Sequence, residues 1–299
     1  MSTFPLSRTA DAKPLTRNNP LPKTPFTALL KSSVKNAEEY RPATADEKAP
    51  ALKDYVSIEE PGTVAADTVR YVTQSGDHVL VLKSTSPKLY KQVVEDRPAL
   101  QAIKQSASEG YKLAAADAKA PETLDGYKAI GPPDEMGPGL IRYVTSDGQQ
   151  LILAEQDNPE LFKQVSADFK ALTGVVASQA DGYQWLGADQ AGPEKLGDYL
   201  AIGPAEEMGP GVIRYVTQDG NKYVVTKRDN PALFDKVNDA YASLSGITSS
   251  EADGYRRATD NEVWPPYSGT AVGAVDEVGP GLIRYDNGSE KVVVARDDN

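Results

Sequence analysis

Apolar and polar residues recur along this chain with two periods, and these predict helices and strands in a fixed order. In residues 159–174 the apolar side chains return every three or four positions, which is the spacing of one face of an α-helix. Asn158 and Pro159 form a helix start, because a capping side chain precedes a proline at the first helical position. Gly174 predicts the helix end, since glycine accepts the left-handed conformation found there. The apolar stripe consists of Leu161, Phe162, Val165, Phe169 and Leu172.

The same helix-start signal occurs four times. In the last copy the stripe runs from Leu233 to Leu244, and Gly246 predicts its end. In the second copy Pro98 predicts an interruption after the first turns, because proline removes a helical hydrogen bond. The first helix, over residues 25–40, is expected to be the shortest. The four signals are Thr24-Pro25, Ser86-Pro87, Asn158-Pro159 and Asn230-Pro231.

Between the helices, apolar positions alternate with period two and predict strands. Residues 140–145 and 150–155 flank a Ser-Asp-Gly turn, and residues 212–217 and 222–227 flank a Gln-Asp-Gly turn. Asp-Gly accepts the positive φ angles of tight hairpins. A polar loop and a short extended piece, residues 198–203, precede the hairpin. Each unit is therefore expected to contain a helix followed by at least three strands.

These elements repeat with a period close to 72 residues. The dipeptide Arg-Tyr begins at positions 70, 142, 214 and 284, and a second set of tyrosines lies at 40, 111, 183 and 255. The predicted fold class is α+β, with four tandem modules that stack into an array, because connections of about four residues are too short for independent tumbling. An open row and a closed ring both fit the sequence. The predicted divisions are a tail over 1–23 and modules over 24–85, 86–157, 158–229 and 230–299.

The amino-acid composition narrows the classes of partner and of chemical site that the chain can have. The chain has 299 residues, a formal net charge of −11 and no cysteine. The acidic balance repels phosphate backbones, so nucleic acid is an unexpected partner. The missing cysteines remove disulfides, thiolate nucleophiles and thiolate metal sites. No apolar run is long enough for a transmembrane segment.

The first 25 residues differ from the rest. They hold five prolines, four bases and one acid, a net charge of +3, which leaves −14 on the remainder. Low apolar content predicts disorder. The tail has no apolar segment of the kind found in Sec-type signal peptides, and two functional interpretations are a type III secretion leader and an organelle transit segment. The plain alternative is an unstructured terminus.

An arginine recurs between apolar neighbours in each hairpin. Strand alternation places Leu140, Arg142 and Val144 on one face of the sheet and Ile141 and Tyr143 on the other. A partly covered guanidinium needs a carboxylate, and two acids lie just upstream in three modules. We interpret the pattern as a structural clamp, with an anion-binding site as the alternative. The clamp residues are Arg70, Arg142, Arg214 and Arg284, with Glu135, Glu207 and Glu277 as the expected partners and Asp134, Glu206 and Asp276 beside them.

Candidates for catalysis are scarce. His78, the only histidine, lies in one hairpin strand without a counterpart elsewhere. Phosphate-binding loops, nucleophile elbows and calcium-loop spacings are not found in the sequence. The sequence predicts neither a catalytic residue, a cofactor nor a metal site, and it favours a protein that is not an enzyme. Asp157 and Asp229 are interpreted, with the following asparagines, as helix caps.

Residues that differ between modules are candidates for partner contact. Trp185 lies between a helix and a hairpin, and Trp264 and Tyr267 form a second aromatic group in the fourth module. Exposed tryptophans are frequent anchors in interfaces. The alternative is that each tryptophan covers its local core.

The sequence therefore favours a non-enzymatic, repeat-containing protein that binds protein partners, and the tail favours a secreted bacterial effector. The alternatives are a cytoplasmic structural or virion-associated assembly protein that self-associates and, least favoured, an enzyme with its site in one divergent module.

Overall fold

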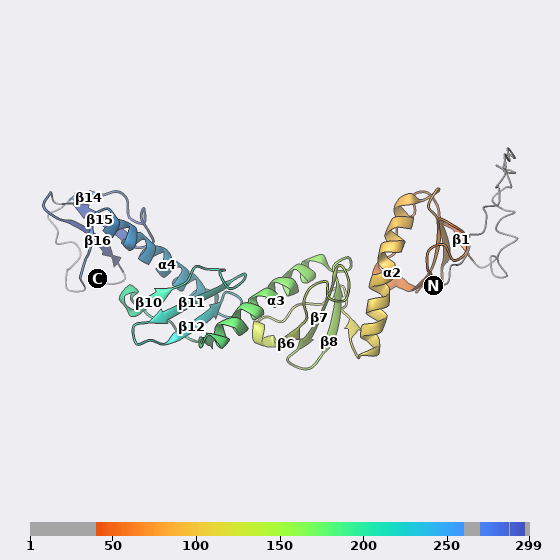
Figure 1. Cartoon of the computed structure of the whole chain (residues 1–299), viewed down its shortest axis with the longest axis horizontal. Coiled ribbons are helices and arrows are strands. Elements are labelled where there is room, and N and C mark those ends of the chain that lie inside the picture. The colour runs from red at the N-terminus through yellow and green to blue at the C-terminus, as the bar shows by residue number, and fades with distance from the viewer. Residues whose placement is uncertain (1–39, 260–269, 287, 297–299) are drawn as a thin grey trace, which may run out of the picture.

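The computed structural model describes residues 40–259, 270–286 and 288–296. It is an α+β structure with four similar four-stranded sheets, and the first three sheets are each followed by a helix of 22 residues (Figure 1). The prediction of an α+β fold with four repeated modules is confirmed at this level. The predicted tail and the first predicted helix, apart from Tyr40, lie outside the described residues.

All four sheets have the same strand order. The predicted hairpin forms two central strands, the extended piece before it adds an antiparallel strand at one edge, and a short strand pairs in parallel at the other edge. Sheet 1 contains β1 (Arg41–Pro42), β2 (Tyr55–Ile58), β3 (Thr68–Thr73) and β4 (His78–Leu82); sheet 2 contains β5 (Lys112–Leu113), β6 (Tyr127–Ile130), β7 (Leu140–Thr145) and β8 (Gln150–Ala154). Sheet 3 contains β9 (Gln184–Leu186), β10 (Tyr199–Ile202), β11 (Val212–Thr217) and β12 (Lys222–Thr226); sheet 4 contains β13 (Arg256–Arg257), β14 (Thr270–Val272), β15 (Leu282–Asp286) and β16 (Lys291–Ala295).

The sequence predicts a polar loop where the structure has the parallel edge strand. Strands of two or three residues, such as β5, are too short to show alternation. In sheets 1 to 3 a 3₁₀ turn precedes the antiparallel edge strand; these turns are η2 (Leu52–Asp54), η3 (Leu124–Gly126) and η4 (Leu196–Asp198).

The helices begin where the sequence predicts and end later. They are α2 (Pro87–Ser108), α3 (Pro159–Ala180) and α4 (Pro231–Ala252). Gly174 and Gly246 lie inside α3 and α4, so the predicted ends there are wrong; the glycines with positive φ after these helices are Gly182 and Gly254.

Gly174 serves a close packing contact. A Cβ atom added to it would lie 1.9 Å from the carbonyl oxygen of Met208, in the loop before β11. Gly246 has the same relation to Val278, at 1.9 Å. Only a residue without a side chain lets the helix approach this loop so closely.

The predicted interruption at Pro98 is also wrong, because α2 continues through it to Ser108. Residues on both sides of Pro98, including Val93 and Ile103, are buried in one apolar cluster. This burial compensates for the missing hydrogen bond, since tertiary packing supplies most of the stability of a helix in a protein.

Each helix packs between two sheets. Leu161 and Val165 of α3 lie in one apolar cluster with Tyr143 of sheet 2 and Val212 of sheet 3. Neighbouring positions on β7 face different helices, as the alternation predicts: Leu140 belongs to the cluster around α2, whereas Ile141 belongs to the cluster around α3. We call the contact regions around α2, α3 and α4 joint 1, joint 2 and joint 3.

The four sheets follow one another in an extended row, with sheets 1 and 4 at opposite ends (Figure 1). Because every helix shares its apolar residues with the sheets on both sides, the row is continuous rather than a set of beads. The division into modules that begin with a helix stays a sequence-based prediction.

Candidate functional site

The repeated arginine of each hairpin stacks on a tyrosine. Arg142 of β7 lies over the ring of Tyr111, with 5.0 Å between the guanidinium carbon and the ring centroid. The two tyrosine and arginine repeats of the sequence therefore meet in space, as a cation–π pair that recurs in every sheet. The other pairs are Arg70 on Tyr40 at 4.5 Å, Arg214 on Tyr183 at 5.0 Å and Arg284 on Tyr255 at 4.7 Å.

The main acid partner comes from the end of the preceding helix. Arg142 Nη1 donates to Oε2 of Glu109 at 2.7 Å, and Arg284 Nη2 lies 2.9 Å from Oδ2 of Asp253. Arg214 Nη1 donates to Asp181 at 3.2 Å, and its Nη2 lies 3.7 Å from the expected partner, Glu207. The guanidinium also lies favourably beside a helix C-terminus, where the helix dipole is negative.

The acids upstream of the arginines mainly hold their own loop. Asp134 Oδ1 accepts the backbone N–H of Gly139 at 2.6 Å, and Glu277 Oε2 accepts that of Ala274 at 2.8 Å. Glu135 lies in the same kind of turn, where its N–H donates to the carbonyl of Pro132. Asp134, Glu206 and Asp276 have positive φ values of 64°, 69° and 67°.

The cluster of arginine, tyrosine and carboxylate has a different acid in sheet 1, where Arg70 pairs with Glu59. The Nε and Nη2 atoms of Arg70 donate to Oε2 of Glu59 at 2.8 and 2.6 Å. Each arginine is thus bound to a ring and a carboxylate, and an incoming anion would have to displace that carboxylate. In joints 1 to 3 the cluster fixes the end of a helix against the next sheet.

A second contact crosses joints 1 and 2. The backbone N–H of Leu52 donates to Oδ1 of Asp157 at 3.2 Å, and that of Leu124 donates to Oδ1 of Asp229 at 2.7 Å. The sequence predicts Asp157 and Asp229, together with Asn158 and Asn230, as helix caps. This is confirmed for the asparagines, which accept the N–H of Leu161 at 3.2 Å and that of Leu233 at 3.0 Å, whereas the two aspartates bind the neighbouring sheet.

Buried carboxylates in the helices hold the same joints. Tyr55 O–H donates to Asp96 at 3.2 Å, and Tyr127 O–H donates to Asp168 at 2.8 Å. Burial raises the pKa of both aspartates, and it also raises the pKa of both tyrosines. Tyrosines with raised pKa values stay protonated, so these pairs act as hydrogen bonds rather than as bases.

Grooves recur where the helix starts meet the neighbouring sheet. At joint 1 a groove of about 930 Å³ runs between residues 45–49, the first turns of α2 and Glu155. At joint 2 the matching groove of about 830 Å³ runs between residues 116–120, the first turns of α3 and Arg228. A smaller groove of about 380 Å³ lies at joint 3.

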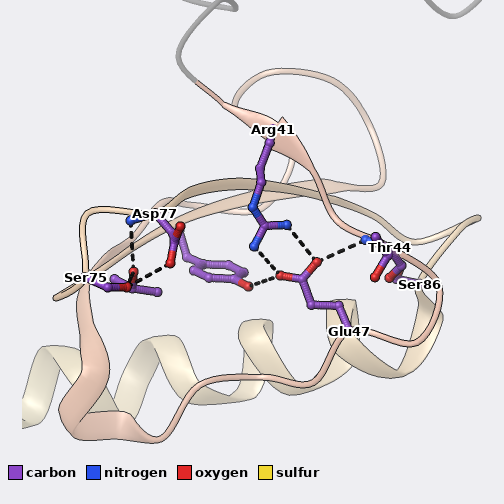
Figure 2. Close-up of polar contacts among 8 residues, drawn as sticks. Arg41, Thr44, Glu47, Ser75, Asp77 and Ser86 are labelled. Atoms are coloured by element: carbon purple, nitrogen blue, oxygen red, sulfur yellow. Dashed lines mark hydrogen bonds and ion pairs between the residues drawn. The ribbon is translucent and has the colours of Figure 1, made fainter.

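A polar network that involves Glu47 borders the groove at joint 1 (Figure 2). Both oxygens of Glu47 accept from Arg41, at 2.8 and 2.9 Å, and they also accept from the N–H of Thr44 and the hydroxyl of Tyr71. The hydrogen bond from Arg41 holds the pKa of Glu47 below its usual range. A carboxylate that already accepts four hydrogen bonds is a poor general base. We therefore interpret this network as a structural support for residues 43–50.

The remaining candidates are Trp185, His78, Trp264 and Tyr267. Trp185 lies on β9 rather than in a loop, and its partly buried ring packs against the cluster around α3. His78 begins β4, and its ring meets Tyr40 edge-on at 5.1 Å. Trp264 and Tyr267 lie outside the described residues.

Within residues 40–259, 270–286 and 288–296, histidine and acidic side chains form no group of three that could hold a metal ion. In the same residues, every helix falls short of the length or the apolar character needed to cross a membrane.

Comparisons of the chain with protein-family models, with curated proteins and with solved structures found no significant match.

Proposed function

We propose that this protein is a non-enzymatic repeat scaffold that binds protein partners along its row. The observation that carries the proposal is the recurrence of one groove at consecutive joints, bordered in each case by the first turns of a helix and by the next sheet. A partner that contacts two equivalent grooves gains avidity without new kinds of contact. Repeat proteins often use such extended surfaces for binding.

Site-specific photo-crosslinking tests this proposal. A crosslinking residue is placed at Lys88 and, in a second variant, at Glu160, which are equivalent exposed positions in the grooves at joints 1 and 2. The control position is Val176, a residue of α3 that is 60% exposed and lies outside both grooves. We expect the same partner to crosslink from Lys88 and Glu160 and not from Val176. Crosslinking that is equal at all three positions would refute the grooves as the binding surface.

Trp185, Trp264 and Tyr267 remain proposed partner contacts. Their test is binding of the identified partner by Trp185→Ala and Trp264→Ala variants. Export by a type III-like route also remains a proposal, based on the tail. If residues 1–25 fused to a reporter stay inside the bacterium, the export proposal fails while the binding proposal stands.

Self-association is the second candidate function. Sheets 1 and 4 lie at opposite ends of the row (Figure 1), so contacts between the two ends of different copies would lengthen the row. Light scattering distinguishes the two functions, because an assembly protein forms large particles that grow with concentration and a binding scaffold stays monomeric.

A further inference from the structure

Tyr199 differs from its two counterparts at the other joints. The rings of Tyr55, Tyr127 and Tyr199 occupy equivalent places, because each meets the next tyrosine of its sheet edge-on. The centroid distances are 5.4, 5.7 and 5.4 Å, for the pairs Tyr55–Tyr71, Tyr127–Tyr143 and Tyr199–Tyr215. The hydroxyl of Tyr199 is therefore directed toward the helix position that holds Asp96 in joint 1 and Asp168 in joint 2.

At joint 3 that position carries Ala240, which lies 72 residues after Asp168. Tyr199 is only 5% exposed, and its hydroxyl is buried without a hydrogen-bond partner. Burial raises the pKa of Tyr199 to about 12, so the hydroxyl keeps its proton at neutral pH and remains a donor. An unsatisfied buried hydroxyl is unfavourable, and an incoming acceptor would remove that penalty.

A groove borders Tyr199, and a small side-chain movement would open the covered hydroxyl to it. Tyr199, Ala240 and Ser243 border the groove at joint 3, whose volume of about 380 Å³ suits a small ligand. Lys195, Lys236 and Arg296 supply positive charge along the same groove. Three acids also line it, Glu194, Asp235 and Asp239, and they disfavour a ligand with several negative charges.

We propose that the groove at joint 3 is a binding site for a single carboxylate, which takes the place of the missing aspartate and accepts from the hydroxyl of Tyr199. The carboxylate belongs either to a small organic acid or to an acidic side chain of a protein partner. The site does not depend on the proposed scaffold function, because a small acid could bind while the other grooves stay empty.

Tyrosine-selective ¹³C NMR of the full chain tests the proposal, with acetate, benzoate and a Gly/Ser peptide that contains one glutamate as probes. We expect a saturable shift of the Tyr199 signal, which a Tyr199→Phe spectrum assigns, and no shift of Tyr127, whose hydroxyl is bound to Asp168. Acetamide, a neutral analogue of acetate, should cause no shift. A shift with acetate or benzoate indicates a small acid, and a shift with the peptide alone indicates a partner side chain.

Two variants make the test specific. Ala240→Asp supplies the carboxylate from the helix itself, so it should abolish probe binding and raise the melting temperature. Tyr199→Phe removes only the donor and should weaken binding by about tenfold, as reported by backbone amide shifts of residues 194–196. The proposal is overturned if no probe gives a saturable shift, or if binding to the Tyr199→Phe chain is as tight as to the unchanged chain.

Discussion

The Oδ1 atom of Asp229 accepts the backbone N–H of Leu124 at 2.7 Å, although 105 residues separate them along the chain. Leu124 begins the 3₁₀ turn of sheet 2, and Asp229 follows the last strand of sheet 3. This hydrogen bond joins two sheets directly, beside the helix that both share. The same relation between Leu52 and Asp157 joins sheets 1 and 2.

Replacing Asp229 by alanine should loosen joint 2. The change leaves the buried N–H of Leu124 without its acceptor, which costs about 1–3 kcal/mol. Amide hydrogen exchange measures the loss of this hydrogen bond directly. We expect the Leu124 amide to exchange faster and the exchange rate of the Leu52 amide to stay unchanged. Asp229→Asn keeps an acceptor and should have a smaller effect. Equal exchange in the alanine variant and the unchanged chain would contradict the account of this joint.

Arg142→Ala should lower the melting temperature. The side chain stacks on Tyr111 and pairs with Glu109, and the two contacts together are worth about 1–2 kcal/mol at a partly exposed site. Arg142→Lys keeps the charge but loses the planar stacking. Its melting temperature should therefore lie between that of the unchanged chain and that of Arg142→Ala. If Arg142→Ala left stability unchanged and abolished partner binding, the anion-binding alternative would replace the structural clamp.

Gly174→Ala should destabilise the protein, although alanine normally favours a helix interior by about 0.5–1 kcal/mol. The added Cβ would lie 1.9 Å from the Met208 carbonyl oxygen, so α3 and the loop before β11 must separate. Ala102 lies at the equivalent position of α2, and Ala102→Gly serves as the reverse change, which costs helix propensity and the burial of one methyl group. Thermal unfolding compares the two variants. A Gly174→Ala chain more stable than the unchanged one would show that the close approach is not required.

Joint 1 should lose stability as the pH rises. Burial raises the pKa of Asp157 and of Asp96 in the folded chain, so the folded state binds protons more tightly than the unfolded state. The free energy of unfolding contributed by these groups therefore falls as the pH increases from about 4 through the raised values. Denaturant titrations at several pH values measure how the free energy of unfolding changes with pH. The Asp157→Asn substitution should make this pH dependence smaller.

Ala154→Thr is the second variant for the pH experiment, because it copies into joint 1 the threonine found in joint 2. Thr226 stands at the equivalent place in joint 2 and donates its hydroxyl to Oδ2 of Asp229, whereas Oδ2 of Asp157 is buried without a partner. A threonine at position 154 should stabilise the Asp157 carboxylate and flatten the pH dependence. A slope that is the same in all three chains would show that Asp157 does not titrate in this range.

Local patterns predicted much of this fold because the contacts that decide them are close in sequence. Asparagine before proline starts α3 and α4, and the glycines at 148 and 220 have the positive φ expected of the hairpin turns. The helix ends were predicted wrongly because Gly174 is needed for the close contact with Met208, which is distant in sequence and lies in the loop before β11. A glycine that ends a helix and one that admits a neighbouring chain look the same in a single sequence.

The site was harder to predict for the same reason. The recurrence of Tyr111 and Arg142 with one period was visible, and a shared period is a signal that two residues could meet. The role of Glu109 was not visible, because the nearer acids Asp134 and Glu135 offered an equally plausible partner. Asp229 looked like part of a helix cap, and only the shared packing of α3 between two sheets brings it to Leu124.

Because each helix packs against two sheets, the repeated joints should hold the four sheets as one rigid row. Because the chain has no cysteine, two introduced cysteines can be spin-labelled without interference. Labels at the exposed positions Lys128 and Leu200, in sheets 2 and 3, report on joint 2 by pulsed electron spin resonance. We predict a single narrow distance distribution, which broadens in the Asp229→Ala chain. A broad distribution in the otherwise unchanged chain would contradict the rigid row.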